Sequence, residues 1–228
     1  KQEPHTCDMP AFLVTRNRIK DVLRFLKSEA TPRFQRLDDL TAIDESARRK
    51  RELFPDFTLV YHLLSFDPAA RLRLKVPLSG PDPTADTVTD IWPAANWYER
   101  EVYDLFGVRF EGHPNLQRLI MPHDWEGHPL RKSNPGRATE MFPYTRNDAQ
   151  KRQPLDGGVY IRHSEEEQEL VLNIGPHHVS THGLIRFIVS LKGEEITKMD
   201  MDIGYHHRGV EKIGERQTWH QFIPYTDR

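Results

Sequence analysis

The segment from Leu172 to Phe187 constrains the fold of this chain more than any other stretch. It places a proline, two glycines and three histidines between apolar runs. Such a segment is too polar and too rich in residues that break regular structure to be core, yet core-like residues bracket it. The pattern therefore predicts a polar turn, centred on residues 175–183 and held rigidly by a strand on either side, which is where proteins tend to place chemistry. A second unusual run, Gly204–Lys212, follows and contains adjacent histidines and Arg208.

Composition limits the classes of protein to consider. The chain has 228 residues, 37% hydrophobic and 29% charged, which suits a folded protein of one large domain or two modest ones. A net charge of −2 gives no general attraction for nucleic acid, so no nucleic-acid partner is expected. Cys7 is the single cysteine. We therefore expect no disulfide framework, a reducing compartment and no iron–sulfur cluster held by this chain alone.

Two further function classes receive no support from the sequence. It contains neither the glycine-rich dinucleotide fingerprint nor the phosphate-binding loop of nucleoside triphosphatases. No apolar stretch approaches the ~18 residues that a membrane-spanning helix needs. If the protein works at a membrane, we expect other chains to bring it there.

Local patterns predict secondary structure for the first part of the chain. Apolar residues recur at helical spacing over residues 18–29, and β-rich runs flank the sequence Asp67-Pro-Ala-Ala70, which indicates a hairpin. The predicted elements are strands at 11–14 and 34–43, a helix at 18–29, hairpin strands at 57–66 and 71–78, and a short helix at 84–91.

The clearest predicted helix starts after Asn96 and ends at Gly107. Asn96 is a favourable N-cap, Glu99 stands at the position of a capping-box acid, and glycine commonly follows a helix end. Beyond it, the motif Gly112-His-Pro recurs as Gly127-His-Pro, so most of this stretch must be irregular. Because it also carries many apolar residues, we expect an ordered, extended arm over residues 107–133 that lies on another surface.

The remainder divides into a polar segment and a second folded part. Residues 134–168 are polar and carry prolines and glycines, which predicts a linker between domains. Strands are expected at 169–174, 184–191 and 195–202, and helical spacing returns over 206–222. The predicted class is α+β.

Two sets of motifs carry a family resemblance. The sequence Asn96-Trp-Tyr-Glu-Arg-Glu-Val-Tyr-Asp-Leu-Phe-Gly107, with the later runs starting at Gly112 and Gly127, resembles the C subunit of respiratory complex I. Leu172–Gly183, Gly204–Lys212 and Pro224–Arg228 resemble the start of the D subunit of the same complex. The presence of the C-like and the D-like motifs in one chain resembles the fused C/D subunit of some bacteria. Gln117 and the pair Ser133-Asn134 depart from the family pattern, both on the expected arm.

The resemblance implies an organisation and a setting. It implies a two-layer α/β, C-like domain with a mixed sheet over residues 1–133, including the arm at 107–133, then the linker at 134–168. An antiparallel β segment leading into a helical domain, over 169–228, would be the amino-terminal part of a D-like domain. The expected complex is NADH:quinone oxidoreductase, a proton-translocating enzyme that uses FMN, iron–sulfur clusters, NADH and quinone, none of the cofactors being bound by this chain. Expected partners are the B, I and membrane-arm H subunits, on the cytoplasmic side of the bacterial inner membrane, and we expect the 228 residues alone to be inactive.

The resemblance also implies a quinone site. It places His182 against the quinone headgroup, with Thr181 and Gly183 beside it, and a tyrosine donor three residues beyond Arg228. Quinone reduction takes two electrons and two protons, and histidine can release a proton near neutral pH. His177 and His178 are expected to shape the loop by hydrogen bonding. His178 and His182 have the spacing of a helical zinc pair, but the glycines and Pro176 oppose a helix, so no metal site is expected.

Arg208 is the second residue with an implied role. In the family this arginine lies near the terminal iron–sulfur cluster of the B subunit, with His207 as a further candidate neighbour of the cluster. The alternative is a surface arginine paired with Glu211 or Glu215 at helical spacing.

Two other functions remain open at this point. The chain also resembles the large subunit of membrane-bound [NiFe] hydrogenases of the formate hydrogenlyase type, although Ser180-Thr-His-Gly183 matches the quinone enzymes. A pure scaffold is the third possibility, because the C-like part shows no catalytic constellation.

Overall fold

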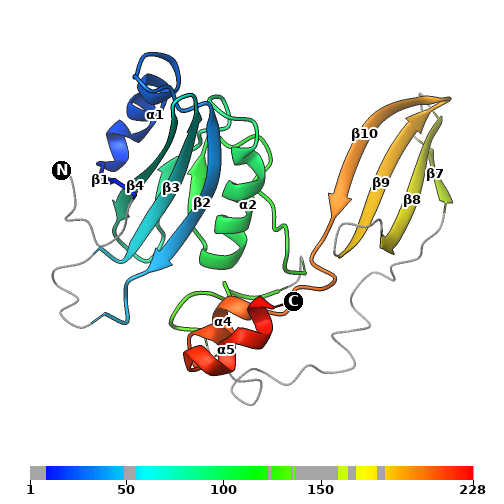
Figure 1. Cartoon of the computed structure of the whole chain (residues 1–228). Helices are drawn as coiled ribbons and strands as arrows, with labels where there is room; N and C mark the ends of the chain where they lie inside the picture. Colours follow the sequence, from blue (N-terminus) through cyan, green and yellow to red (C-terminus); the bar gives the residue numbers. More distant parts are fainter. Residues whose placement is uncertain are drawn as a thin grey trace. The chain divides into compact units, whose positions relative to one another are not determined.

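The chain folds into two compact units (Figure 1). A computed structural model describes residues 9–48, 55–122, 125–134, 136, 159–163, 168–178 and 183–227. The first unit contains Lys1–Arg118 and Glu126–Pro135, and the second contains Leu119–Trp125 and Gly136–Arg228. One holds a mixed sheet and the other an antiparallel sheet, which confirms the expected α+β class.

A four-stranded sheet of order β1-β4-β3-β2 is the centre of the first unit. β1 runs parallel to β4, whereas the other neighbours are antiparallel. The predicted hairpin is confirmed with a tighter turn, because Phe66 pairs with Ala69 and leaves only Asp67 and Pro68 between the strands. The strands are β1 (Ala11–Leu13), β2 (Arg36–Asp44), β3 (Phe57–Phe66) and β4 (Ala69–Leu78).

Alternation along β4 gives this sheet a buried face. Leu74 and Val76 are buried and pair with Tyr61 and Leu59 of β3, so the four side chains share one face. The helix α1 (Ile19–Ser28) follows a 3₁₀ turn, η1 (Arg16–Arg18), and buries Ile19 completely.

The helix predicted at residues 84–91 is wrong. Residues Thr84–Asp86 form β5, which pairs in parallel with β6 (Arg109–Glu111), and a turn follows in which the N–H of Ile91 donates to the carbonyl of Val88. Local sequence could not reveal this strand, because its partner lies beyond the next helix.

The helix α2 (Ala95–Phe106) begins two residues earlier than predicted, with Ala94 as N-cap, so Asn96 does not cap it. Glu99 does not complete a capping box either. Its fully buried carboxylate accepts hydrogen bonds from the Thr87 hydroxyl at 2.6 Å and the Val88 N–H at 2.7 Å. The end at Gly107 is confirmed, with φ at +77° and its N–H donating to Tyr103.

The last part of the predicted arm packs within the first unit. The N–H of Leu130 donates to the carbonyl of Leu105 at 3.0 Å, and the Arg131 guanidinium donates to the carbonyl of Phe106 at 2.6 Å. These contacts place the 128–132 region against the carboxyl end of α2.

The second unit contains an antiparallel sheet of order β10-β9-β8-β7. β9 (Leu184–Lys192) and β10 (Glu195–Asp202) confirm the prediction, whereas β8 (Gln168–His178) is longer than expected. Residues Val159–His163 form the strand β7, although they lie inside the range 134–168 that the sequence predicts to be linker. The expected helical region holds two short helices, α4 (Val210–Gly214) and α5 (Trp219–Thr226).

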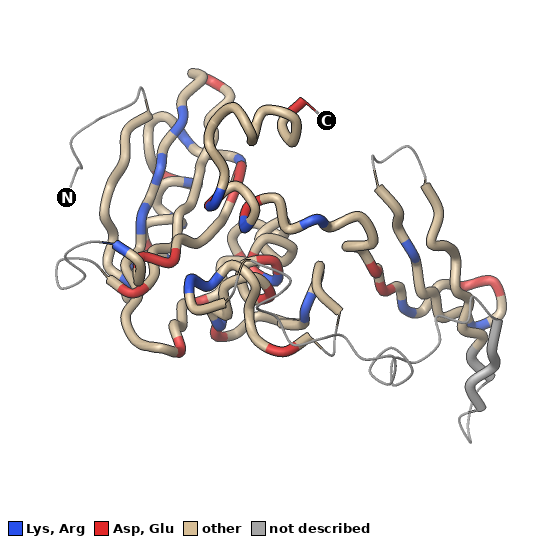
Figure 2. Tube along the Cα trace, turned by 90° about the horizontal axis from the view of Figure 1, so that it is seen from below, with Lys and Arg blue, Asp and Glu red and all other residues tan. Residues whose placement is uncertain are grey.

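Charges of both signs are interspersed along the described trace (Figure 2). In the part of the chain that the structure describes, no helix is long and apolar enough to span a membrane.

Candidate functional site

Both motifs of the second unit leave the sheet at the same end. β8 finishes there at His178, which pairs with Leu184 at the start of β9, and β10 finishes there at Asp202, which pairs with Arg186. Because neighbouring strands are antiparallel, the end of β8, the start of β9 and the end of β10 must coincide. The end of β8, the start of β9 and the end of β10, which residues 203–209 follow, therefore lie at one end of the same sheet.

The histidine segment is shorter as a loop than the sequence predicts. His177 and His178 are exposed residues at the end of β8, paired with Ile185 and Leu184, so they are not part of a turn. The register shifts between Ile174 and His177, and Gly175 occupies this irregularity with φ at +105°. A Cβ there would lie 2.6 Å from the carbonyl oxygen of Ile185, so the bulge requires glycine.

Of the three residues expected to contact quinone, the structure describes one. His182 and Thr181 lie outside the described residues. Gly183 is described, immediately before β9, and a Cβ there would meet no atom within 4 Å. Its expected role in close approach of the quinone ring remains a prediction.

A polar network fastens the segment after β10 to the sheet. Arg186, whose side chain is 12% exposed, donates to the Asn173 amide oxygen at 3.2 Å and lies 3.8 Å from the Asp202 carboxylate. The hydroxyl of Tyr205 donates to the same carboxylate at 2.8 Å. Burial and Asp202 both raise the pKa of Tyr205, which keeps this hydroxyl protonated as a donor. Sequence reasoning missed this network, although Arg186 stands out as the charge in the apolar run of β9.

The run Gly204–Lys212 continues as a turn and a short helix. Gly204 has φ at +94°, and a Cβ there would lie 2.2 Å from the carbonyl oxygen of Ile120. The N–H of His207 donates to the Gly204 carbonyl at 3.0 Å, while the His207 side chain is exposed. Gly209, with φ at +62°, is the N-cap of α4.

Arg208 therefore precedes α4 and is not a helical residue. Because α4 starts after Arg208, the alternative ion pair between Arg208 and Glu211 or Glu215 does not have helical spacing. The Glu215 carboxylate lies 3.7 Å from the Lys212 ammonium instead. Arg208 is exposed and forms no ion pair with any residue that the structure describes.

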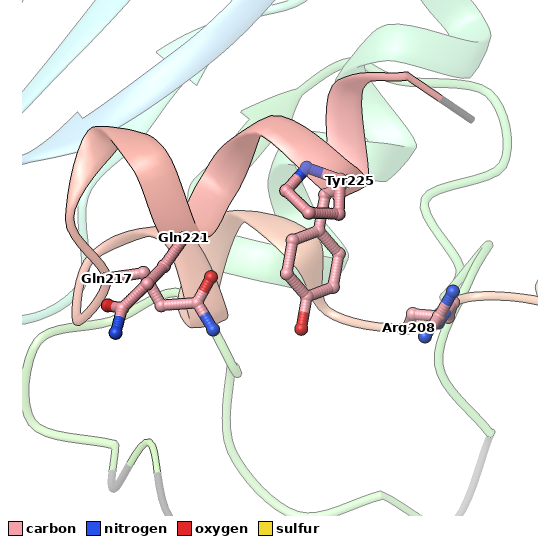
Figure 3. A pocket seen from close by; sticks show the side chains of 5 residues that line it. Arg208, Gln217, Gln221 and Tyr225 are labelled. Atoms are coloured by element: carbon pink, nitrogen blue, oxygen red, sulfur yellow. The ribbon is translucent and has the colours of Figure 1, made fainter.

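An open pocket of about 520 Å³ lies beside Arg208 (Figure 3), and its lining residues are Arg208, Gln217, Gln221, Pro224 and Tyr225. The guanidinium carbon lies 5.8 Å from the centroid of the Tyr225 ring, which in turn stacks on Phe222 at 5.7 Å. This pocket offers a cation, two amides and an aromatic face to whatever adjoins it.

A separate buried cluster lies in the first unit around Glu99. His113 Nε2 is 3.9 Å from the carboxylate, and neither side chain is exposed. Burial raises the pKa of Glu99 to about 7 and lowers the pKa of His113, so the two groups do not form a stable ion pair despite their distance. His113 Nδ1 accepts from the Asn115 N–H, which leaves Nε2 to donate to the carbonyl of Asn96. The cluster joins α2 to the turn after β5 and has the character of a structural clamp.

No group of three or more histidine, cysteine, aspartate or glutamate residues that could hold a metal lies within the described ranges. The described side chains around Arg208 offer hydrogen bonds, a cation and an aromatic face.

Comparison with known proteins places the chain in a family. The family model of the respiratory-chain NADH dehydrogenase 30 kDa subunit matches residues 12–140, more than half of the chain. The NADH-quinone oxidoreductase C/D subunit of Methylococcus capsulatus is 50% identical over 217 residues, covering 91% of this chain and 37% of that protein. The C/D subunit of Nitrosospira multiformis is 48% identical over 231 residues, covering 97% and 38%.

Among solved structures, the trypsin-resistant fragment (1-134) of Nqo5 is 33% identical, with a TM-score of 0.45, and covers 51% of this chain and 89% of that one. The chain spans under two fifths of the length of the two curated relatives named above. The resemblance predicted from the motifs is confirmed. The chain belongs to the family of the respiratory-chain NADH dehydrogenase 30 kDa subunit, and it is similar across both units to the fused C/D subunits of NADH-quinone oxidoreductase.

Proposed function

We propose that this chain is part of a peripheral-arm subunit of NADH:quinone oxidoreductase. In this proposal the second unit forms one wall of the quinone-reduction site, and the first unit docks and scaffolds. The observation that carries it is the shared sheet end at which β8 finishes, β9 starts and β10 finishes, because the histidine motif adjoins the first two and the Arg208 motif follows the third. Electron transfer from a cluster to quinone needs the two binding elements to be near each other, and this topology supports such proximity.

The curated relatives favour this function over the two alternatives. Each of the two compared above is named as a subunit of NADH-quinone oxidoreductase, not of a hydrogenase. The buried Glu99–His113 cluster of the first unit joins α2 to a turn, and this structural character supports docking as the role of that unit. The proposed partners are the B subunit with its terminal cluster, the I subunit and the membrane-arm H subunit, at the cytoplasmic side of the inner membrane.

His182 is the proposed ligand and proton donor of the quinone headgroup. Reduction of quinone to quinol adds two electrons, which arrive from the partner's cluster, and two protons; protonated His182 can supply one to a carbonyl oxygen, and a second donor of the assembled site supplies the other. Thr181 and Gly183 would line the same wall. FMN and the iron–sulfur clusters belong to other subunits in this proposal, and this chain holds no redox cofactor.

Arg208 is the proposed cation beside the terminal cluster, with His207 adjacent in the same turn. Its fit is supported by its exposure and by the lack of an ion pair with the described residues, since its charge is not neutralised among them. A fixed cation stabilises the more negative, reduced form of a cluster and so raises its reduction potential.

The test is His182→Ala in the intact complex, with His178→Ala as the matched control, because His178 is a nearby exposed strand residue. Quinone reduction by NADH should collapse in the first variant and persist in the second, while NADH oxidation by an artificial acceptor persists in both. Unchanged quinone reduction in His182→Ala would contradict the proposed role.

A further inference from the structure

We infer that Tyr225 is a positioning residue that holds the Arg208 guanidinium at a fixed place beside the partner's terminal cluster. The inference rests on the proposed role of Arg208 and extends it to a residue on a different helix. The Tyr225 ring fixes the orientation of the Arg208 guanidinium, because the turn that carries Arg208 does not fix it.

The first step is the contact between cation and ring. The guanidinium carbon is 5.8 Å from the Tyr225 centroid, within the ~6 Å over which the negative face of an aromatic ring attracts a cation. In Figure 3 the Tyr225 ring lies between Gln221 and Arg208. A contact with the ring face keeps the full charge available, whereas a carboxylate partner would neutralise it.

The second step is the freedom of Arg208 without the ring. The residue belongs to no helix or strand, and the next residue, Gly209, has φ at +62°. Its side chain is exposed and has no ion-pair partner in the described ranges. A long side chain in such a turn samples many rotamers, so an orienting contact is needed for a constant distance to an external group.

The third step is the rigidity of the ring itself. Tyr225 stacks on Phe222 with an interplanar angle of 24°. Phe222 lies close against Gly214 of α4, where a Cβ would come within 2.9 Å of the ring. At the start of α5, the Thr218 N–H donates to Gln221 Oε1 at 3.2 Å in a capping box. The two helices thus form a platform on which Tyr225 is held.

The consequence concerns the potential of the cluster. The energy between two charges falls with their separation, so a guanidinium that swings away loses part of its influence on the cluster. Removal of the Tyr225 ring should therefore lower the reduction potential of the cluster, as removal of the Arg208 charge does, but by less.

The experiment is a redox titration of the terminal cluster in the intact complex, followed by its paramagnetic resonance signal. The variants are Arg208→Gln, Tyr225→Leu and Tyr225→Phe, with Phe222→Leu as a second route that loosens the platform but keeps the ring. The intensity of the cluster signal reports assembly of each variant.

We expect Arg208→Gln to lower the midpoint potential, Tyr225→Leu and Phe222→Leu to lower it by less, and Tyr225→Phe to leave it near the parent value. Tyr225→Leu should cause no further change in an Arg208→Gln background. A lowered potential in Arg208→Gln with none in Tyr225→Leu or Phe222→Leu would overturn the inference and leave the role of Arg208 standing. An unchanged potential in Arg208→Gln would overturn both.

Discussion

The buried carboxyl of Glu99 makes the stability of the first unit depend on pH, and Glu99→Gln should remove that dependence. Burial raises its pKa from an ordinary 4.5 to about 7. The folded state therefore binds more protons than the unfolded state between these two values, and the free energy of unfolding must fall as pH rises through them. A difference of roughly 2.5 pH units at about 1.4 kcal/mol each gives about 3 kcal/mol.

Glutamine retains the shape of glutamate and an acceptor oxygen for the Val88 N–H. Hence the variant and the parent should differ least below pH 4.5, where the carboxyl is protonated in both folded and unfolded states. The variant should gain up to about 3 kcal/mol relative to the parent by about pH 8, where the parent bears the full cost of a buried charge.

Hydrogen exchange of peptides from α2, measured across a urea series at about pH 4.5 and about pH 8, gives the unfolding free energy of the first unit separately from the second. Glu29→Gln is the matched control, because it removes one carboxylate from the exposed surface just after α1. Parallel pH profiles for the parent and Glu99→Gln would refute the reasoning.

Three further predictions concern an ion pair, steric crowding at a glycine and a hydrogen bond. Arg118→Met removes the cation 2.7 Å from the fully buried Asp104 carboxylate and should destabilise the first unit by about 3 kcal/mol in urea unfolding, whereas the exposed Arg33→Met should change stability little. Gly107→Ala should lower the unfolding free energy more than Gly127→Ala in the same assay. Both glycines have φ near +78°, but only at Gly107 would a Cβ meet Arg131 and His128 at 2.5 Å. Equal losses would exclude crowding as the cause. Tyr205→Phe deletes the hydrogen bond to Asp202 and should speed amide exchange in residues 203–209 by roughly fivefold, which corresponds to the loss of about 1 kcal/mol. Unchanged exchange would argue against the network.

Predictions from sequence succeeded where local chemistry decides the structure. The hairpin over β3 and β4 follows from two β-rich runs around Asp67-Pro68, and the end of α2 follows from Gly107, whose left-handed backbone few other residues adopt. The family motifs identified the family because they are long and specific.

Sequence reasoning failed where the partner of a group lies far along the chain. Local patterns predict a helix where β5 forms, because its partner, β6, follows α2. The position of Glu99 in the sequence fits a helix cap, whereas its hydrogen-bond donors, Thr87 and Val88, lie in a turn before the helix. The Arg186 network and the Tyr225 contact escape prediction for the same reason, since pairing across strands and between helices does not show in local periodicity.

In the proposed function, the segment between β8 and β9 contacts quinone in the assembled enzyme. The most direct measurement is photolabelling of the intact complex with an azido-quinone, followed by mass spectrometry of the tryptic peptide that runs from His163 to Arg186. We expect labelling of this peptide within residues 179–183, suppressed by excess unmodified quinone. Labelling confined to other subunits, with this peptide unmodified under the same conditions, would contradict it.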